Sequence, residues 1–285
     1  MRRTRSGALL VVLLATLAAC ASGATPAPSA PPSASVSAAP SAAAGSPVAP
    51  GGLTIYAAAS LKGALDKAKT AWEVAYPGSK LTISTDASSA LETQIEQGAP
   101  ADVFLSADTT NPKKLVDTGL AAGAAVTFAG NKLTIIVPTA NPAGIRTPAD
   151  LARQGVKVIA AGDAVPITKY ATQLVANLAK EAGYPADFAG AYAANIASKE
   201  DNVKAVVAKV ELGEGDAGIV YVTDARASTK VTTIEVPDPA NVPATFAGVV
   251  VRASASPASA QAFLAWFAGP NGQAILASFG FLPPP

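Results

Sequence analysis

The stretch Leu53-Thr54-Ile55-Tyr56-Ala57-Ala58-Ala59-Ser60-Leu61 decides both the fold and the candidate site. It predicts a strand that ends in a hydroxyl, after which apolar residues follow one helix face, at Leu61, Ala64, Leu65, Ala68, Trp72 and Ala75. Ser60 therefore occupies the predicted N-cap. The free N–H groups of the first turn and the positive end of the helix dipole would lie beside its hydroxyl. This junction predicts either an anion site or an ordinary serine cap.

The first 20 residues have the pattern of an export signal. Three arginines precede an apolar run from 8 to 14, which is too short to span a membrane, and small residues lead to Cys20. Cys20 is the only cysteine of the chain, so it has no disulfide partner within it. Its context resembles a lipobox, in which the cysteine becomes the acylated N-terminus. We predict a lipoprotein signal peptide over 1–20; a signal peptide that merely contains a cysteine is the alternative.

The segment 21–52 predicts a disordered tether. It contains only Ala, Ser, Pro, Gly, Thr and Val, and so cannot bury enough apolar surface to fold. Its seven prolines favour an extended chain that would hold a folded body away from a membrane. The folded part is predicted over 53–285, which is long enough for one large domain or two lobes.

The residue inventory excludes several classes of function. The chain has no histidine, and its one cysteine lies in the predicted signal, so Ser-His-Asp triads, Cys-His pairs and zinc sites built on His or Cys are excluded. Three of the 21 Lys and Arg also lie in the signal, which leaves 18 against 20 Asp and Glu. This balance offers no basic surface for nucleic acid.

Strand-sized and helix-sized patterns alternate through the folded part. Further strands are predicted at 80–85, 101–105, 133–137, 156–160, 217–222, 231–236 and 245–251. Further helices are predicted after Ser88 and at 111–116, 167–182, 202–210, 257–267 and 271–279. The continuous apolar run 133–137 is typical of a buried parallel strand. The alternation predicts α/β architecture with largely parallel sheets.

Four helix starts share what an anion site needs. Ser60 and Ser88 offer hydroxyls, and the helices that open at Ile167 and Val203 leave backbone N–H groups without acceptors. Each helix end carries about half a positive charge, so four converging ends would supply about +2, enough to face a dianion without Lys or Arg. Periodicity alone does not show that they converge.

The chain resembles the molybdate-binding proteins of ABC importers in an ordered set of motifs. These are Tyr56-Ala57-Ala58-Ala59-Ser60-Leu61, Ala87-Ser88-Ser89, Gln94 to Phe104, Gly130-Asn131-Lys132-Leu133, Ala161-Gly162-Asp163 before Val165-Pro166, Gly218 to Ala225, and Gly280-Phe281. The resemblance implies a two-lobed periplasmic-binding-protein fold of type II, with a ligand cleft between the lobes and a hinge that the chain crosses twice. We expect lobe 1 to comprise 53–132 plus 243–285 and lobe 2 to comprise 133–242.

The resemblance also implies the residues of the site. A tetrahedral oxyanion would be held by the hydroxyls of Ser60, Ser88 and Tyr221 and by backbone N–H groups at Ile167 and Val203. Ile167 stands where members of the family often have a small residue, and a threonine follows it where glycine is common. Because the contact expected at Ile167 is through its backbone, the larger side chain need not abolish it, but the residues that shape the cleft there differ from the family pattern. Molybdenum would be bound as molybdate, without a direct metal ligand from the protein.

The expected function is capture of molybdate, and of tungstate, by closure of the lobes. The partners would be the permease and ATPase of an ABC importer and, through Cys20, the membrane. We expect no enzymatic activity, no cofactor besides the ligand, no nucleic-acid partner, a monomer, and a lipid-anchored location on the outer face of the cytoplasmic membrane. A site lined only by hydrogen-bond donors would disfavour hydrogen phosphate, whose O–H would lack an acceptor.

Other interpretations are weighed against this one. The alternative in the same class is a receptor for sulfate or another small anionic solute. A serine hydrolase with Ser60 as nucleophile and Lys62 as base has the wrong spacing for a Ser-x-x-Lys motif. An adhesive surface domain is disfavoured by the absence of an internal repeat.

The charged residues near the predicted helix starts do not indicate a further functional site. A metal site is disfavoured because no spaced acidic loop is present; the acids considered are Asp86, Asp102, Asp108 and Asp163. The lysines near three helix starts are expected to be solvated; they are Lys62, Lys169 and Lys204.

Overall fold

The computed structural model describes residues 51–285. The predicted signal peptide, the lipid attachment at Cys20 and nearly all of the predicted tether lie outside the described residues. The strands are β1 Gly52–Ala58, β2 Lys80–Asp86, β3 Val103–Ser106, β4 Val126–Asn131, β5 Leu133–Pro138, β6 Val158–Ala161, β7 Ile196–Glu200, β8 Ala217–Tyr221, β9 Val231–Ile234 and β10 Ala244–Val250.

Helices connect these strands. They are α1 Lys62–Ala75, α2 Ser88–Glu96, α3 Thr110–Asp117, α4 Pro166–Leu178, α5 Phe188–Ala194, α6 Val203–Glu211, α7 Val222–Arg226, α8 Pro257–Ala268 and α9 Pro270–Ser278, with 3₁₀ turns η1 Ala59–Leu61 and η2 Pro148–Ala152. No helix within 51–285 is both long enough and apolar enough to cross a membrane.

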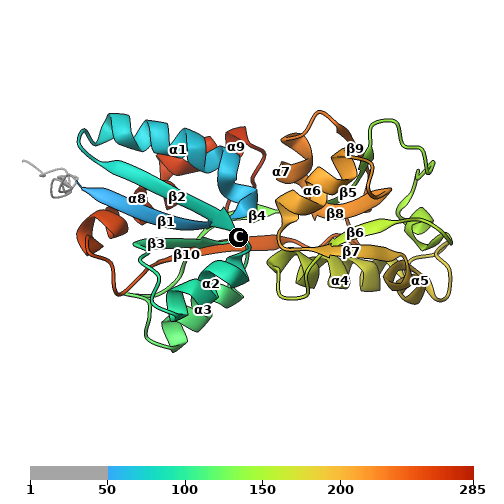
Figure 1. The fold of residues 1–285 in the computed structure, drawn as a ribbon, viewed down its shortest axis with the longest axis horizontal. Coiled ribbons are helices and arrows are strands. Elements are labelled where there is room, and N and C mark those ends of the chain that lie inside the picture. The colour runs from blue at the N-terminus through green and yellow to red at the C-terminus, as the bar shows by residue number, and fades with distance from the viewer. Residues whose placement is uncertain (1–50) are drawn as a thin grey trace, which may run out of the picture. The chain divides into compact units, whose positions relative to one another are not determined.

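The first sheet has the strand order β2-β1-β3-β10-β4 (Figure 1). Strands β2, β1 and β3 are parallel, whereas β10 runs antiparallel to both β3 and β4. Helices α1, α8 and α9 pack together on one face, and α2 and α3 cover the other. Helices therefore cover both faces, and Leu53, Ile55 and Ala57, which share one face of β1, are almost fully buried.

The second sheet repeats this plan with the order β7-β6-β8-β5-β9. Strands β7, β6 and β8 are parallel, and β5 runs antiparallel to β8 and β9. Helices α6 and α7 pack on one face and α4 and α5 lie on the other (Figure 1). In both sheets the three parallel strands precede helices whose N-termini lie at the same edge, which is where ligands bind in open α/β sheets.

The chain passes between the sheets twice. Strand β4 ends at Asn131 in the first sheet and β5 begins at Leu133 in the second, and β10 returns to the first sheet after β9. The predicted α/β fold with two sheets and a double crossover is confirmed. The division into lobes at residues 132 and 242 stays a prediction.

The prediction that 133–137 is a parallel strand was wrong. The strand exists, but it is antiparallel to both of its neighbours. A continuous apolar run reports burial on both faces and does not contain the direction of the neighbouring chain. Four elements were also not predicted, namely β4, α5, β7 and α7, of which β7 is a polar edge strand and the two helices are short.

Candidate functional site

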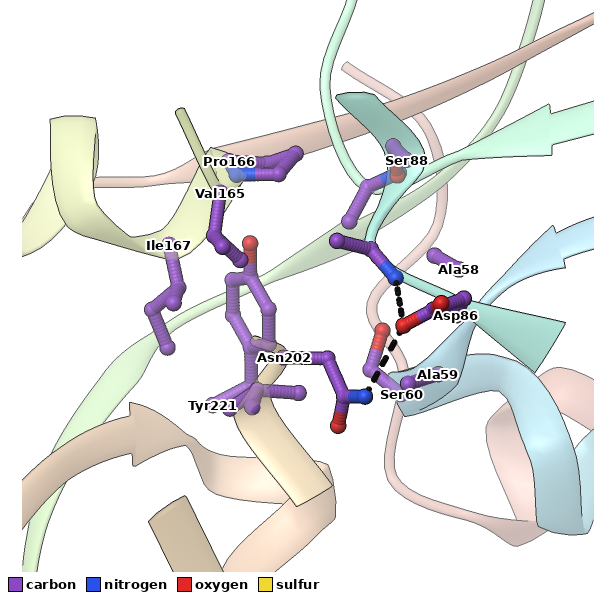
Figure 2. Close-up of a pocket in the computed structure, with 13 residues that line it drawn as sticks. Ala58, Ala59, Ser60, Asp86, Ser88, Val165, Pro166, Ile167, Asn202 and Tyr221 are labelled. Carbon is purple, nitrogen blue, oxygen red and sulfur yellow. Dashed lines mark hydrogen bonds between the residues drawn. The ribbon is translucent and has the colours of Figure 1, made fainter. Parts of the chain in front are cut away.

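All five residues predicted for the site line one small cavity. Figure 2 shows Ser60 and Ser88 on the side of the first sheet and Ile167 and Tyr221 on the side of the second. Val203 completes the set from the start of α6. The structure therefore brings together the turn that precedes α1 and the starts of α2, α4 and α6, although Ser60 and Val203 are 143 positions apart in the sequence.

Ser60 lies inside the 3₁₀ turn that links β1 to α1. The prediction that it is the helix N-cap was wrong, because the N-cap is Ala58 for the turn and Leu61 for α1, and no side chain caps either one. The tighter turn places the serine one step inside the helical segment, so its Oγ is not used by the backbone. Ser60 is only 6% exposed, and Oγ has no hydrogen-bond partner among the described residues.

The serine-hydrolase interpretation lacks a base at Ser60. The amine of Lys62 lies 2.8 Å from Asp66, on an exposed face of α1. Because Oγ of Ser60 contacts neither this amine nor another polar group of residues 51–285, no described group is placed to remove its proton.

Ser88 is the first residue of α2, after Ala87 as the N-cap. Its Oγ does not cap the helix but accepts a hydrogen bond from the backbone N–H of Ala107 at 3.0 Å, in the loop after β3. The side chain is buried, so this bond fixes the oxygen while the hydroxyl proton stays available to donate. Ser88 thus lines the cavity with a hydroxyl that can still donate.

Ile167 and Val203 are the second residue of α4 and the first of α6, so their N–H groups have no acceptor within the helix. The start of α4 is held by Thr168, whose Oγ1 donates to the carbonyl of Gly162 at 2.7 Å. The start of α6 is capped by Asn202, whose Oδ1 accepts from the N–H of Ala205 at 3.1 Å. The side chain of Ile167 is itself buried, so the bulk that distinguishes it from the family pattern is packed within the protein.

Tyr221 is the last residue of β8 and is 1% exposed. Its ring packs edge-on against Phe246 of β10, with the centroids 5.4 Å apart. Burial raises the pKa of its phenol well above the usual range, so the hydroxyl keeps its proton. The OH has no hydrogen-bond partner within residues 51–285, which leaves a buried donor at the cavity wall.

Lys204 was expected to be solvated because it lies near a helix start, but it forms an ion pair with a buried carboxylate. Its amine lies 2.9 Å from the carboxylate of Asp224, which is completely buried on α7. Burial raises the pKa of Asp224, and the lysine opposes that shift. The ion pair joins α6, which carries Val203, to the helix that directly follows Tyr221. Lys204 thus acts within the second half, away from the cavity wall.

Asp86 and Asn202 also line the cavity, and sequence reasoning did not place them there. Oδ1 of Asp86 accepts from the N–H of Ala87 at 2.8 Å and from Nδ2 of Asn202 at 2.9 Å (Figure 2). Asp86 is the one charged side chain on the cavity wall among the described residues. The expectation of a wall made only of donors was therefore wrong. Their places at a strand end and an N-cap were visible in the sequence; their contact, across 116 positions, was not.

The other acids considered for a metal have separate partners. Asp102 accepts from the N–H of Thr54, Asp108 accepts from the N–H of Asn111 at the start of α3, and Asp163 pairs with Lys199. Within residues 51–285 no group of three or more acidic, His or Cys side chains is arranged to hold a metal ion.

Two α/β halves with hydroxyls and helix N-termini around a shared cavity offer hydrogen-bond donors that suit a small anion. The chain belongs to the family of bacterial extracellular solute-binding proteins, whose model matches residues 53–282.

Similar proteins include the molybdate-binding protein ModA of Mycobacterium tuberculosis, which is 36% identical over 233 residues that cover 81% of this chain and 85% of the relative. The periplasmic molybdate-binding protein of Azotobacter vinelandii has a similar structure, with a TM-score of 0.70 and 25% identity over 82% of this chain and all of that one. The sulfate-binding protein SubI of M. tuberculosis shares the fold, with a TM-score of 0.71 and 23% identity over 81% of this chain and 86% of that one.

Proposed function

We propose that this chain captures molybdate as the substrate-binding component of an ABC importer. The observation that carries the proposal is a pair of buried, unpartnered hydroxyls, Ser60 Oγ and Tyr221 OH, on one cavity. Burying a hydroxyl without a partner costs about 1–3 kcal/mol, so both are expected to donate to a ligand rich in acceptors. Similarity to proteins named for molybdate supports this oxyanion as the ligand.

The proposed mechanism is capture by closure. Ser60 and Ser88 would bind the anion from lobe 1 (53–132 plus 243–285), and Ile167, Val203 and Tyr221 would bind it from lobe 2 (133–242). The anion would then link the lobes and shift the population toward the closed form. The closed protein would be recognised by the permease, and the ATPase would drive release into the membrane channel.

The remaining parts of the proposal follow from the sequence. The chain would be exported and anchored through an acylated Cys20 to the outer face of the cytoplasmic membrane, where it would act as a monomer and without enzymatic activity. Tungstate, which has nearly the same size and charge as molybdate, would bind the same donors. Acylation is tested by mass spectrometry of the chain recovered from membranes, with Cys20→Ser as the control.

The ligand is tested by the melting temperature in molybdate, tungstate, sulfate and phosphate. At 100 times its Kd a one-site ligand adds about 2.7 kcal/mol, or about 5–10 °C for a folded part of this size. We expect shifts with molybdate and tungstate alone. A shift with sulfate of equal size would favour the alternative receptor for smaller anions, and no shift with any of the four would contradict the oxyanion assignment.

A further inference from the structure

A hydrogen bond between side chains joins the two halves at the cavity wall. Asp86 ends β2 in the first sheet, and Asn202 precedes α6, which packs on the second. Nδ2 of Asn202 donates to Oδ1 of Asp86 at 2.9 Å, and both residues are partly buried (Figure 2). The bond forms only while the halves are as close as they are here.

The position of this bond relates it to ligand exchange. Asp86, Ala87 and Val165 line both the small cavity and a wider groove beside it. Asn202 lines only the cavity, and its neighbour Asp201 lines only the groove. Asp86, one partner of the bond, thus lies on the border that the cavity and the groove share. An anion that left the cavity toward this groove would pass beside the bond.

Both side chains are held in place before they meet. The N–H of Ala87 fixes the carboxylate of Asp86, and Asn202 is fixed by its own capping bond to Ala205. Because each is already oriented, joining them loses little side-chain entropy. A charged acceptor also makes a stronger hydrogen bond than a neutral one.

We propose that Asp86 and Asn202 form a clasp that favours the closed form and slows release of the anion. The effect on release of the anion rests on the proposed function, whereas the effect on closure of the two halves does not. Asp86 has two opposed effects on the bound anion. Its hydrogen bond with Asn202 stabilises the closed cleft, and its negative charge repels the anion and so weakens binding. Closure outweighs repulsion in this proposal.

The test measures dissociation of labelled molybdate in a chase experiment and the radius of gyration of the ligand-free chain by solution scattering. Asp86→Ala removes the acceptor, and Asn202→Ser removes Nδ2 but keeps a capping oxygen for α6. Each variant is expected to release molybdate about tenfold faster, as for one hydrogen bond to a charged group. The double variant is expected to be no faster than either single variant, and all three to have a larger radius of gyration than the parent.

Asp163→Ala is the matched control. Asp163 lines the same groove and carries the same charge, but it pairs with Lys199 within the second half. The Asp163→Ala variant is expected to release molybdate at the same rate as the parent and to have the same radius of gyration. The clasp is overturned if Asp86→Ala releases molybdate more slowly, which is the result of repulsion alone, or if the two single effects multiply. If the parent does not bind molybdate, the proposed function fails, and the radii alone decide the clasp: equal radii overturn it.

Discussion

At the scale of single residues, the two serines of the cavity differ in their hydrogen bonding. Oγ of Ser60 has no partner in the described structure, whereas Oγ of Ser88 accepts the N–H of Ala107. Both serines are buried, and both lie at a predicted helix start. The sequence pattern therefore does not show which of the two hydroxyls has a hydrogen-bond partner within the protein. Only the second serine is part of the protein's own hydrogen bonding.

This difference predicts separable effects of two alanine substitutions. Ser60→Ala is expected to stabilise the ligand-free protein by up to about 1–3 kcal/mol, because it removes a buried hydroxyl that has no partner, and to weaken molybdate binding about 10–100-fold. Ser88→Ala is expected to weaken binding similarly and also to destabilise the protein by about 1–3 kcal/mol, because the buried N–H of Ala107 loses its acceptor. Urea unfolding and calorimetric titration of both variants check this. Equal stability of the two variants would contradict the assigned bond, and unchanged affinity would contradict the site.

Glu92 gives a residue-scale prediction of pH dependence. It is 2% exposed on α2, and burial, together with the neighbouring Glu96, raises its pKa above the ordinary 4.5, while Lys114 opposes the shift. A carboxyl with a raised pKa in the folded state stabilises the protein while protonated, and this contribution is lost as pH rises through the folded pKa.

Glu92→Gln is therefore expected to gain stability relative to the parent as pH rises from 4 to 7. Unfolding by urea at several pH values measures the difference between the two proteins, with the exposed Glu181→Gln as the control. A difference that stays flat or shrinks over this range would show that Glu92 ionises in the folded state as readily as in the unfolded one.

At the scale of elements, Gly218 sets how closely α6 approaches β8. A Cβ added there would lie 2.8 Å from Cγ1 of Val206 on α6 and 3.0 Å from the carbonyl oxygen of Ile159 on β6. Neither distance is compatible with ordinary packing, and the backbone oxygen cannot move without shifting its strand. The glycine thus lets the helix that carries Val203 and Asn202 sit against the sheet.

Gly218→Ala is expected to destabilise the protein by about 1–3 kcal/mol through overpacking. Because a shift of α6 moves its N-terminus, molybdate affinity is expected to fall as well. Gly123→Ala is the matched control, since an added Cβ there meets no atom within 4 Å. Unfolding curves and titrations of both variants decide the matter; equal stability of the two would contradict the close approach.

At the scale of the whole molecule, the site belongs to neither half alone. Two serine hydroxyls come from the first sheet and its helices, and Tyr221 with the starts of α4 and α6 comes from the second. The two chain crossings between the sheets leave the halves joined by short segments, so a shared ligand is expected to couple them.

Hydrogen exchange of the whole chain tests this coupling. With saturating molybdate, backbone amides at the starts of α1, α2, α4 and α6 are expected to exchange more slowly, by up to the stabilisation that the ligand confers. Protection should therefore occur in both halves. Protection confined to one half would contradict binding between them.

How much could be predicted depended on how local the signal was. The sequence by itself determined most of the strand and helix order, the hydroxyls at Ser60 and Ser88, the exclusion of histidine chemistry, and, through an ordered set of motifs, the family. Each of these features depends on residues that are close together in the sequence, because backbone periodicity and capping chemistry act over a few positions.

Only the tertiary structure decided the rest. It showed that four helix starts share one cavity, that β5 and β10 run antiparallel to their neighbours, that Lys204 pairs with buried Asp224, and that Asp86 meets Asn202. The physical reason is that burial and partner choice depend on which surfaces the folded chain brings together, and a residue's own neighbours in sequence do not contain that information.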